Sequence, residues 1–330
     1  MVNQMTTSVA MCTYNGARFI EEQLRSIITQ TMPVGEIVVC DDRSTDNTTE
    51  IIQTIAQETN IPIHIHINEP SLGCVRNFEK AIRLCQGDII FLSDQDDIWK
   101  KNKVEVVCEY FNNHSNKTVL ISNANLIDEQ GECFTDVTLF DVVGLNEQLR
   151  YFDMGLATEL LLQSNRATGC TMALRKGFIP DMHINLDATP NSGMQIHDGC
   201  IAMSAALNNA LGYIREPLTL YRQHLSQTCG LGWWINSPKH YPSPLIPKGY
   251  YDTSFGISHI RIEMQYLRGR KYTRYGSIIM HINKYYRAYG SELMWKFIKY
   301  DFYLKMLPVI KVAYRIGKFF LKPFFEQREC

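Results

Sequence analysis

Short apolar runs alternate with amphipathic stretches over the first hundred residues of the chain. Four runs have the length and composition of buried strands: 8–12, 36–40, 61–67 and 88–92. Three intervening stretches place apolar side chains at helical spacing: 17–30, the segment capped by Ser44-Thr45-Asp46, and 77–85. Alternating strands and helices predict an α/β fold with a Rossmann-like, mainly parallel sheet flanked by helices.

The pattern beyond residue 98 is less regular. Its expected elements are helices over 99–112 and 197–208 and strands over 118–124 and 169–174. Residues 211–221 are expected to pass through a turn at Glu216-Pro217 into a short strand. Residues 130–165 have no assignable period, and the Gly, Pro, Ser and Trp content of 230–256 indicates a linker.

Charge is distributed unevenly along the 330 residues. The net charge is −1, but residues 261–330 hold 15 Lys or Arg and 5 Asp or Glu, a balance of +10, so residues 1–260 carry −11. The ten cysteines include no Cys-x-x-Cys pair, which favours free thiols in a reducing compartment. With no secretory-signal pattern and no run of about 18 apolar residues, we expect a cytoplasmic protein without a spanning helix.

Acidic side chains follow two of the predicted strands. Asp94-Gln95-Asp96-Asp97 comes after one buried strand, and Asp41-Asp42 after another. Because ligands of such sheets bind at the carboxyl ends of strands, we expect the two clusters to converge. Carboxylates at a buried edge are costly unless a cation lies among them, and Mg²⁺ and Mn²⁺ prefer oxygen ligands. The sequence therefore predicts a divalent metal that carries a phosphate-bearing ligand.

Several motifs occur in a specific order along the chain. They occupy residues 9–16, 36–46, 71–73, 77, 87–88, 93–97, 169–170, 197–198 and 221–224. Together they resemble the family 2 glycosyltransferases of the GT-A fold, and the Ser-Asp-Gln-Asp-Asp-Ile-Trp form is most similar to bacterial surface-polysaccharide, rhamnosyltransferase-like members. The resemblance covers about residues 8–226.

The resemblance implies a division of the chain. Residues 1–229 would form the catalytic domain, with a nucleotide-binding half over about 1–100 and an acceptor half over about 101–229. Residues 230–330 would contain the linker and a basic, helical C-terminal extension.

The resemblance also implies a donor site for a nucleoside-diphosphate sugar with Mn²⁺ or Mg²⁺. Asp96 matches the principal metal ligand, and Asp94 would assist it directly or through water. His224 matches a position that supplies either a metal ligand or a structural hydrogen bond. The alternative for Asp96 or Asp97 is a helix cap before Trp99, although a cap needs one acidic residue and this loop has three.

The nucleoside would lie at the ends of the first two strands. Thr13 and Tyr14 match the start of its pocket, where Tyr14 would either stack on the base or only pack against the strand end. Asp42 matches a contact to the base or ribose, with Asp41 as its helper. A solvated turn is the alternative for this pair.

Asp198 matches the base of an inverting transfer, which takes the proton of the attacking acceptor hydroxyl. An N-cap is the alternative for this residue, and His197 would orient the base or serve the structure. Arg76 and Arg222 are expected near the donor diphosphate, although a surface salt bridge also suits Arg76.

The basic C-terminal region contains one amphipathic segment. Four basic residues share a helical face: Lys311, Arg315, Lys318 and Lys322. Phenylalanines lie nearby, so we expect this segment to bind an anionic membrane surface, the alternative being a helix packed on the catalytic domain. Nothing resembles a nucleic-acid-binding motif, and no nucleic acid partner is expected.

Taken together, these features predict a metal-dependent, inverting hexosyltransferase that is peripheral on the inner face of the cell membrane. It would extend a lipid-linked glycan in O-antigen or capsule synthesis. Two alternatives remain open: a sugar nucleotidyltransferase, and a non-catalytic glycan-binding protein on the same fold.

Overall fold

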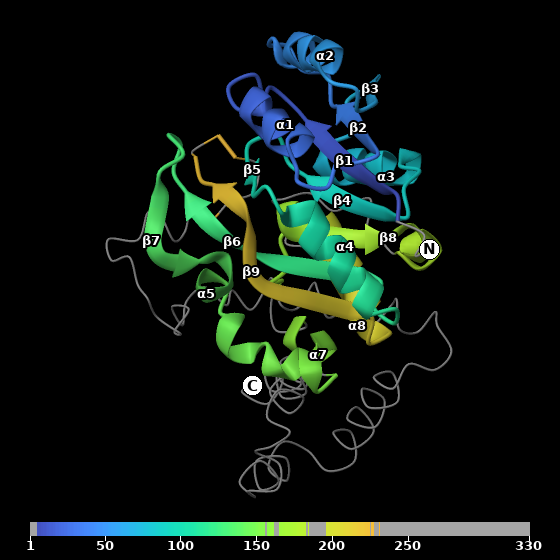
Figure 1. The fold of residues 1–330 in the computed structure, drawn as a ribbon, viewed down its shortest axis with the longest axis vertical. Helices are drawn as coiled ribbons and strands as arrows, with labels where there is room; N and C mark the ends of the chain where they lie inside the picture. Colours follow the sequence, from blue (N-terminus) through green and yellow to red (C-terminus); the bar gives the residue numbers. More distant parts are fainter. Residues whose placement is uncertain are drawn as a thin grey trace, which may run out of the picture.

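Strands of the described residues form one curled sheet with helices on both faces (Figure 1). The computed structural model describes residues 5–155, 157–161, 165–182, 184, 196–224, 226, 227 and 231. The strands are β1 Thr7–Thr13, β2 Glu36–Asp41, β3 Ile63–Ile67, β4 Ile89–Ser93, β5 Ile98–Trp99, β6 Val119–Ile127, β7 Cys133–Thr138, β8 Met172–Arg175 and β9 Leu211–Arg222.

Helices connect most of these strands. The α-helices are α1 Ile20–Ile28, α2 Thr48–Glu58, α3 Cys74–Leu84, α4 Lys103–Asn113, α5 Leu139–Val142, α6 Arg150–Asp153, α7 Ala157–Leu161 and α8 His197–Leu207. Short 3-10 helices cover Asn146–Gln148, Gly169–Thr171 and Lys176–Asp181.

The sheet has the strand order β3-β2-β1-β4-β8-β6-β9-β5, with β7 paired to β6. The first four strands are parallel, β8 runs antiparallel to both β4 and β6, and β9 is parallel to β6. The predicted α/β fold is confirmed, and its parallel part is followed by a mixed part. Since β1, β2, β4, β6 and β9 all run in the same direction, their carboxyl ends lie along one edge of the sheet.

Two hydrophobic cores lie on opposite faces of the sheet. Alternate residues of β1 point to opposite faces, so Val9 and Met11 pack with α1, α2 and α4, whereas Ala10 and Cys12 pack with α3 and α8. The near-continuous apolar runs in the sequence follow from this burial on both faces, which is typical of strands covered by helices on each side.

Three local expectations were wrong. Trp99 does not begin the expected helix but lies in β5, where it pairs with Thr219 of β9, and α4 begins at Lys103. Gly169–Thr171, expected in a strand over 169–174, forms a 3-10 helix, and β8 begins at Met172. Pro217 does not turn the chain into a separate strand. β9 is continuous, and its register against β6 shifts around Pro217, which has no N–H to donate to the ladder.

The predicted linker and basic extension lie, except for Leu231, outside the described residues, and so does the predicted domain boundary at residue 229. No helix among the described residues is long and apolar enough to span a bilayer.

Gly87 provides a test of how closely the sheet packs before β4. A Cβ at this position would lie 2.6 Å from the carbonyl carbon of Thr7 and 2.7 Å from the nitrogen of Ser8, both backbone atoms that cannot rotate away. We expect Gly87→Ala to lower the free energy of unfolding by about 2 kcal/mol, as overpacking does. Urea denaturation measures this.

Gly177→Ala is the matched control, because a Cβ at Gly177 meets nothing within 4 Å. We expect its unfolding midpoint to match or exceed that of the wild type. Equal midpoints for both variants would contradict the packing described for Gly87.

Candidate active site

The residues that follow β4 form an acidic loop, Asp94 to Asp97, at the carboxyl edge of the sheet. Chain segments far apart in the sequence meet this loop. The end of β9 brings Arg222 and His224 to it, and the start of α8 brings Asp198. Arg222 and His224 reach the acidic loop because β9 ends at the same edge of the sheet as β4, whereas Asp198 comes from the first turn of a helix.

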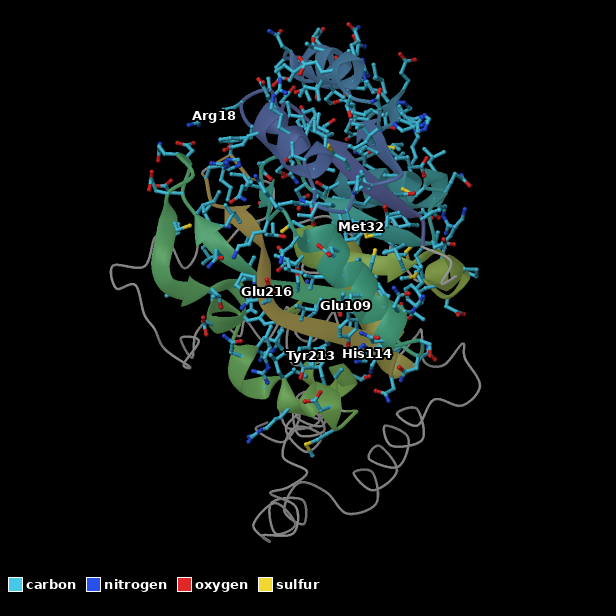
Figure 2. The ribbon with its side chains drawn as sticks, in the orientation of Figure 1. Arg18, Met32, Glu109, His114, Tyr213 and Glu216 are labelled. Carbon is cyan, nitrogen blue, oxygen red and sulfur yellow. The ribbon has the colours of Figure 1, made fainter. Side chains whose placement is uncertain are left out.

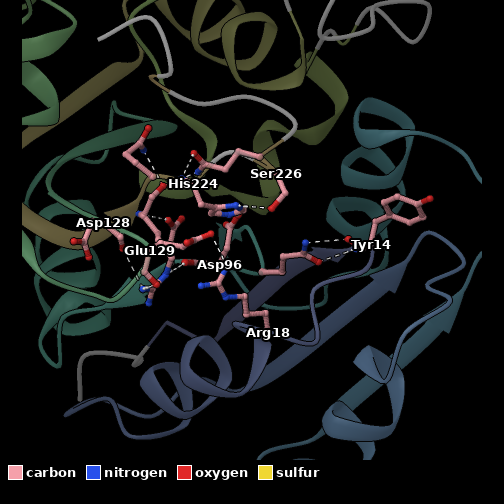
Figure 3. A network of polar contacts seen from close by, with 12 residues as sticks. Tyr14, Arg18, Asp96, Asp128, Glu129, His224 and Ser226 are labelled. Carbon is pink, nitrogen blue, oxygen red and sulfur yellow. Dashed lines mark hydrogen bonds and ion pairs between the residues drawn. The ribbon is translucent and has the colours of Figure 1, made fainter. Parts of the chain in front are cut away.

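Asp96 contacts His224 directly. The Oδ2 atom of Asp96 and the Nε2 atom of His224 are 2.9 Å apart, and Nδ1 of His224 lies 2.8 Å from Oγ of Ser226 (Figure 3). The His224 ring also packs against Phe19, with 4.8 Å between ring centroids. The two side chains predicted as metal ligands are thus hydrogen-bonded to each other.

Arg222 is buried beneath this pair. Its backbone N–H donates to Oδ1 of Asp97 at 3.0 Å, and its Nε donates to the carbonyl of Asp96 at 2.8 Å. Its Nη1 donates to the carbonyls of Asp128 and Glu129 in the turn between β6 and β7 (Figure 3). Arg222 therefore fixes the acidic loop to the ends of β6 and β9.

The other end of the guanidinium reaches α1. Nη2 of Arg222 pairs with Oε2 of Glu22 at 2.5 Å, and the guanidinium lies 4.9 Å from the ring centroid of Phe19. The Arg222 side chain is only 2% exposed. These contacts favour a role for Arg222 in holding the site together over the predicted direct contact with a donor diphosphate.

The acidic loop is electrostatically unfavourable without a cation. Burial and the carboxylates of Asp96, Asp97 and Asp198 raise the pKa of Asp94. Burial, with Asp96 as the next cause, raises the pKa of Asp97 to about 7. Oδ2 of Asp97 is buried without a hydrogen-bond partner among the described residues.

These observations fit a divalent metal. A cation at this edge would relieve the repulsion between the carboxylates, and the carboxylate oxygens of Asp94 and Asp96 suit Mn²⁺ or Mg²⁺. Among the described residues, the group of three whose potential ligand atoms all lie within 4.8 Å of one another is Asp94, Asp97 and Cys170, and it includes neither Asp96 nor His224.

Lys103 is a functional candidate that the sequence reasoning missed. It is buried at the start of α4, where its Nζ donates to the carbonyl of Cys170 at 2.8 Å and to Oγ1 of Thr219 at 2.9 Å. Burial lowers the pKa of Lys103 to about 8, against the opposing effect of Asp97 and Asp94. Lys103 thus places positive charge behind the acidic loop.

A sequence signal for Lys103 did exist. Val107 and Phe111 follow it at intervals of four residues, so Lys103 continues the buried face of α4. A lysine on an apolar helical face needs a compensating partner, which here is the acidic loop.

Asp198 lies in the first turn of α8 and is buried. Its Oδ1 accepts from Nδ2 of Asn165 at 3.1 Å and from the N–H of Gly199 at 2.6 Å, and its Oδ2 accepts from the N–H of Gly169 at 3.2 Å. A carboxylate offers about four acceptor positions, so one stays available for a hydroxyl. Ile196, not Asp198, is the N-cap residue of this helix.

His197 packs under the base position. Its ring stacks on Phe78 with 4.1 Å between centroids, and burial lowers its pKa, so the neutral form is favoured despite the neighbouring Asp198. A Cβ on Gly169 would lie 3.0 Å from Nε2 of His197, which explains a glycine there.

The ends of β1 and β2 are joined by side chains. Oδ2 of Asp41 accepts from Oγ1 of Thr13 at 2.7 Å and from Oγ of Ser44 at 2.6 Å. Thr13 and Asp41 are both buried, so they brace the predicted nucleoside pocket from below.

Asp42 holds the loop before α3. Its carboxylate accepts hydrogen bonds from Asn68, Ser71, Leu72 and Gly73. Burial alone would raise the pKa of Asp42, but these four donors outweigh it and lower the pKa. With about four acceptor positions filled, Asp42 could bind a base N–H only by giving up one of these bonds.

Tyr14 and Arg76 are exposed. The Tyr14 side chain is 56% exposed, and its ring points away from the polar network in Figure 3. Arg76 lies in the first turn of α3. The structure thus leaves the Tyr14 ring available to stack on a base.

Asp97 caps no helix, because α4 begins at Lys103 and Asp97 accepts the Arg222 N–H instead.

The chain is similar to known proteins in both its sequence and its fold. The family model described as "Glycosyl transferase family 2" matches residues 8–179. The dTDP-rhamnosyl transferase RfbG of Shigella flexneri is 33% identical over 232 residues, which are 67% of this chain and 73% of that protein. The putative teichuronic acid biosynthesis glycosyltransferase TuaG of Bacillus subtilis is 34% identical over 103 residues, 31% of this chain and 40% of TuaG.

The fold is similar to that of S. aureus TarS residues 1–349, crystallised in complex with UDP-GlcNAc. The TM-score is 0.51 at 21% identity, and the match covers 68% of this chain and 60% of that one. At this identity the likeness establishes the fold alone.

Replacement of Arg222 tests its role in holding the site. Lysine keeps the charge but cannot reproduce a planar fork of five donors, so buried carbonyls would lose their partners. We expect Arg222→Lys to lower the free energy of unfolding by about 3 kcal/mol. Chemical denaturation measures the loss.

Arg215→Lys is the control on the same strand. Arg215 is exposed, and its guanidinium lies 5.8 Å from the ring centroid of Tyr213. Tyr213 and Glu216 lie well away from Arg18 (Figure 2). We expect its effect to stay within about 0.5 kcal/mol. An equally small effect of Arg222→Lys would mean that its buried contacts contribute little to stability.

Proposed function

The chain belongs to glycosyl transferase family 2, and on that premise we propose that it transfers a sugar from a nucleoside-diphosphate donor to a lipid-linked glycan acceptor, with inversion at the anomeric carbon. The observation that carries this proposal is the convergence of the acidic loop with Asp198: the N–H of Gly169 donates to Asp198, and the thiol of the next residue, Cys170, lies within 4.8 Å of carboxylate oxygens of Asp94 and Asp97. One edge of the sheet thus holds both a cluster of carboxylates that a cation would stabilise and, in Asp198, a carboxylate suited to act as a base.

The donor half is assigned to residues at or just after the ends of β1, β2, β4 and β9 and to one residue of α3. Asp96, Asp94 and His224 would hold Mn²⁺ or Mg²⁺, which neutralises the charge of the departing diphosphate. Tyr14 would stack on the base, while Thr13, Asp41 and Asp42 shape its pocket. Arg76, exposed on α3, would contact the diphosphate, and Arg222 would position the acidic loop.

Asp198 is assigned the role of general base. As the acceptor hydroxyl oxygen forms its bond to the anomeric carbon, its proton passes to the Asp198 carboxylate. The bond between the anomeric carbon and the diphosphate oxygen breaks, so the nucleoside diphosphate leaves with the electron pair. Hydrogen bonds from Asn165, Gly169 and Gly199 hold the carboxylate in place during this step.

The pathway is proposed from the relatives. The names of RfbG and TuaG describe a dTDP-rhamnosyl transferase and a teichuronic acid biosynthesis enzyme, both bacterial. They support a role in bacterial surface polysaccharide synthesis, such as O-antigen or capsule. Such an acceptor would place the protein at the inner face of the cell membrane.

Two substitutions separate donor binding from transfer. We expect Asp96→Ala to abolish metal-dependent binding of a nucleoside diphosphate, because the principal ligand is lost. We expect Asp198→Asn to bind the nucleotide normally and to lower transfer at least about 100-fold, because the amide cannot take the proton. Calorimetry with Mn²⁺ and a radiolabelled transfer assay measure the two effects after a screen of nucleotide sugars.

Glu109→Gln is the control, since Glu109 is exposed on α4 (Figure 2). Full transfer by Asp198→Asn would remove that residue from the base role. Release of pyrophosphate in place of a nucleoside diphosphate would instead identify a nucleotidyltransferase.

The basic C-terminal segment is proposed to bind the membrane. We expect reversal of Lys311, Arg315, Lys318 and Lys322 to Glu to abolish flotation with anionic liposomes, since each cation contributes about 1 kcal/mol at such a surface. Wild-type flotation should also fail with neutral liposomes. Equal flotation of wild type and variant would show that the segment does not provide the attachment.

A further inference from the structure

The side chain of Gln95 joins the acidic loop to the loop that follows β1. The N–H of Tyr14 donates to Oε1 of Gln95 at 2.8 Å, and Nε2 of Gln95 donates to the carbonyl of Tyr14 at 3.0 Å (Figure 3). One side-chain amide thus pairs with both backbone groups of one residue, as a neighbouring strand would.

This contact continues the sheet beyond the end of a strand. The ladder between β1 and β4 ends at Met11 and Ser93, where the β4 chain turns away into the acidic loop. Gln95 then supplies the hydrogen bonds that a longer β4 would have made. Glutamine suits the position because its amide both donates and accepts, whereas a carboxylate only accepts.

Gly16 provides the space for this amide. A Cβ on Gly16 would lie 2.2 Å from Oε1 of Gln95, so any larger residue would displace the side chain. Gly16 has no positive φ angle, and alanine is therefore compatible with its backbone. The Gln95 amide therefore occupies the space that a side chain at position 16 would fill.

The same loop is held from its other side by the segment between β2 and α2. The N–H groups of Asn15, Gly16 and Ala17 donate to Oγ of Ser44, Oγ1 of Thr48 and Oδ2 of Asp46. The loop is thus preorganised, and Gln95 sets its position relative to the acidic loop.

We propose that Gln95 is a positioning residue that holds the nucleoside pocket, through Tyr14, at a fixed separation from the metal-binding carboxylates. The inference rests on the proposed function, in which Tyr14 stacks on the base and Asp94 and Asp96 bind the metal. A rigid separation lets one donor engage both ends of the site without first ordering the loop.

Three variants test the proposal: Gln95→Ala, Gly16→Ala and the double variant. We expect each single variant to weaken binding of the preferred nucleotide among UDP, dTDP and GDP by about tenfold in the presence of Mn²⁺, the effect of losing about two hydrogen bonds. Because both substitutions remove the same contact, the double variant should also lose about tenfold. Gln53→Ala, an exposed position on α2, is the control.

Two further measurements distinguish the loss of positioning by Gln95 from a general loosening of the loop that follows β1. In wild type the Tyr14 N–H should exchange slowly with solvent, and both single variants should speed it while the N–H groups of residues 15–17 stay protected. The Mn²⁺ concentration that half-saturates nucleotide binding should change less than about twofold, because the carboxylates are intact.

Wild-type affinity in Gln95→Ala, unchanged exchange of its Tyr14 N–H, or a hundredfold loss in the double variant would each overturn the proposal. A large rise in the Mn²⁺ requirement would do the same, because it would assign Gln95 to the metal loop alone. Failure of the wild-type protein to bind any of the three nucleotides would count against the proposed function, and the exchange measurement would still test the contact.

Discussion

The site depends on how the protein holds several carboxylates together at one edge of a buried sheet. Asp94, Asp96 and Asp97 raise the free energy of the metal-free loop through burial and mutual repulsion, and the raised pKa of Asp97 expresses this cost. Arg222 opposes it, because its Nε donates to the carbonyl of Asp96 and its backbone N–H donates to the carboxylate of Asp97. Lys103 adds a second buried cation behind the loop.

These compensating groups come from distant parts of the chain because of the sheet topology. β9 is parallel to β6 and ends beside the acidic loop, so Arg222 at its end and His224 just beyond it both reach Asp96. Side chains then take over where strands stop, as Thr13 and Asp41 do between β1 and β2. Hydrogen bonds between side chains thus join neighbouring strands beyond the point where their backbone hydrogen bonds end.

The sequence predicted the elements whose signal is local. Apolar runs placed β1, β2 and β4 within about one residue of their observed bounds, because both faces of these strands are covered by helices. It failed where pairing with a distant strand outweighs local preference. Trp99 joins β9 through β5, and Pro217 is accommodated by a register shift in a strand that continues past it.

Residue types and their order by themselves identified the family, the acidic loop and the candidate base at Asp198, because chemistry of this kind needs carboxylates. The acidic loop follows a strand, and Asp198 lies in the first turn of α8. The tertiary structure decided which carboxylates face one another and which already accept hydrogen bonds from other groups of the protein. The Asp42 carboxylate already accepts hydrogen bonds from the loop before α3, and the Arg222 side chain is buried. Lys103 is buried at the start of α4. A sequence contains no distances, and hydrogen bonds between residues more than a hundred positions apart exist only once the sheet has formed.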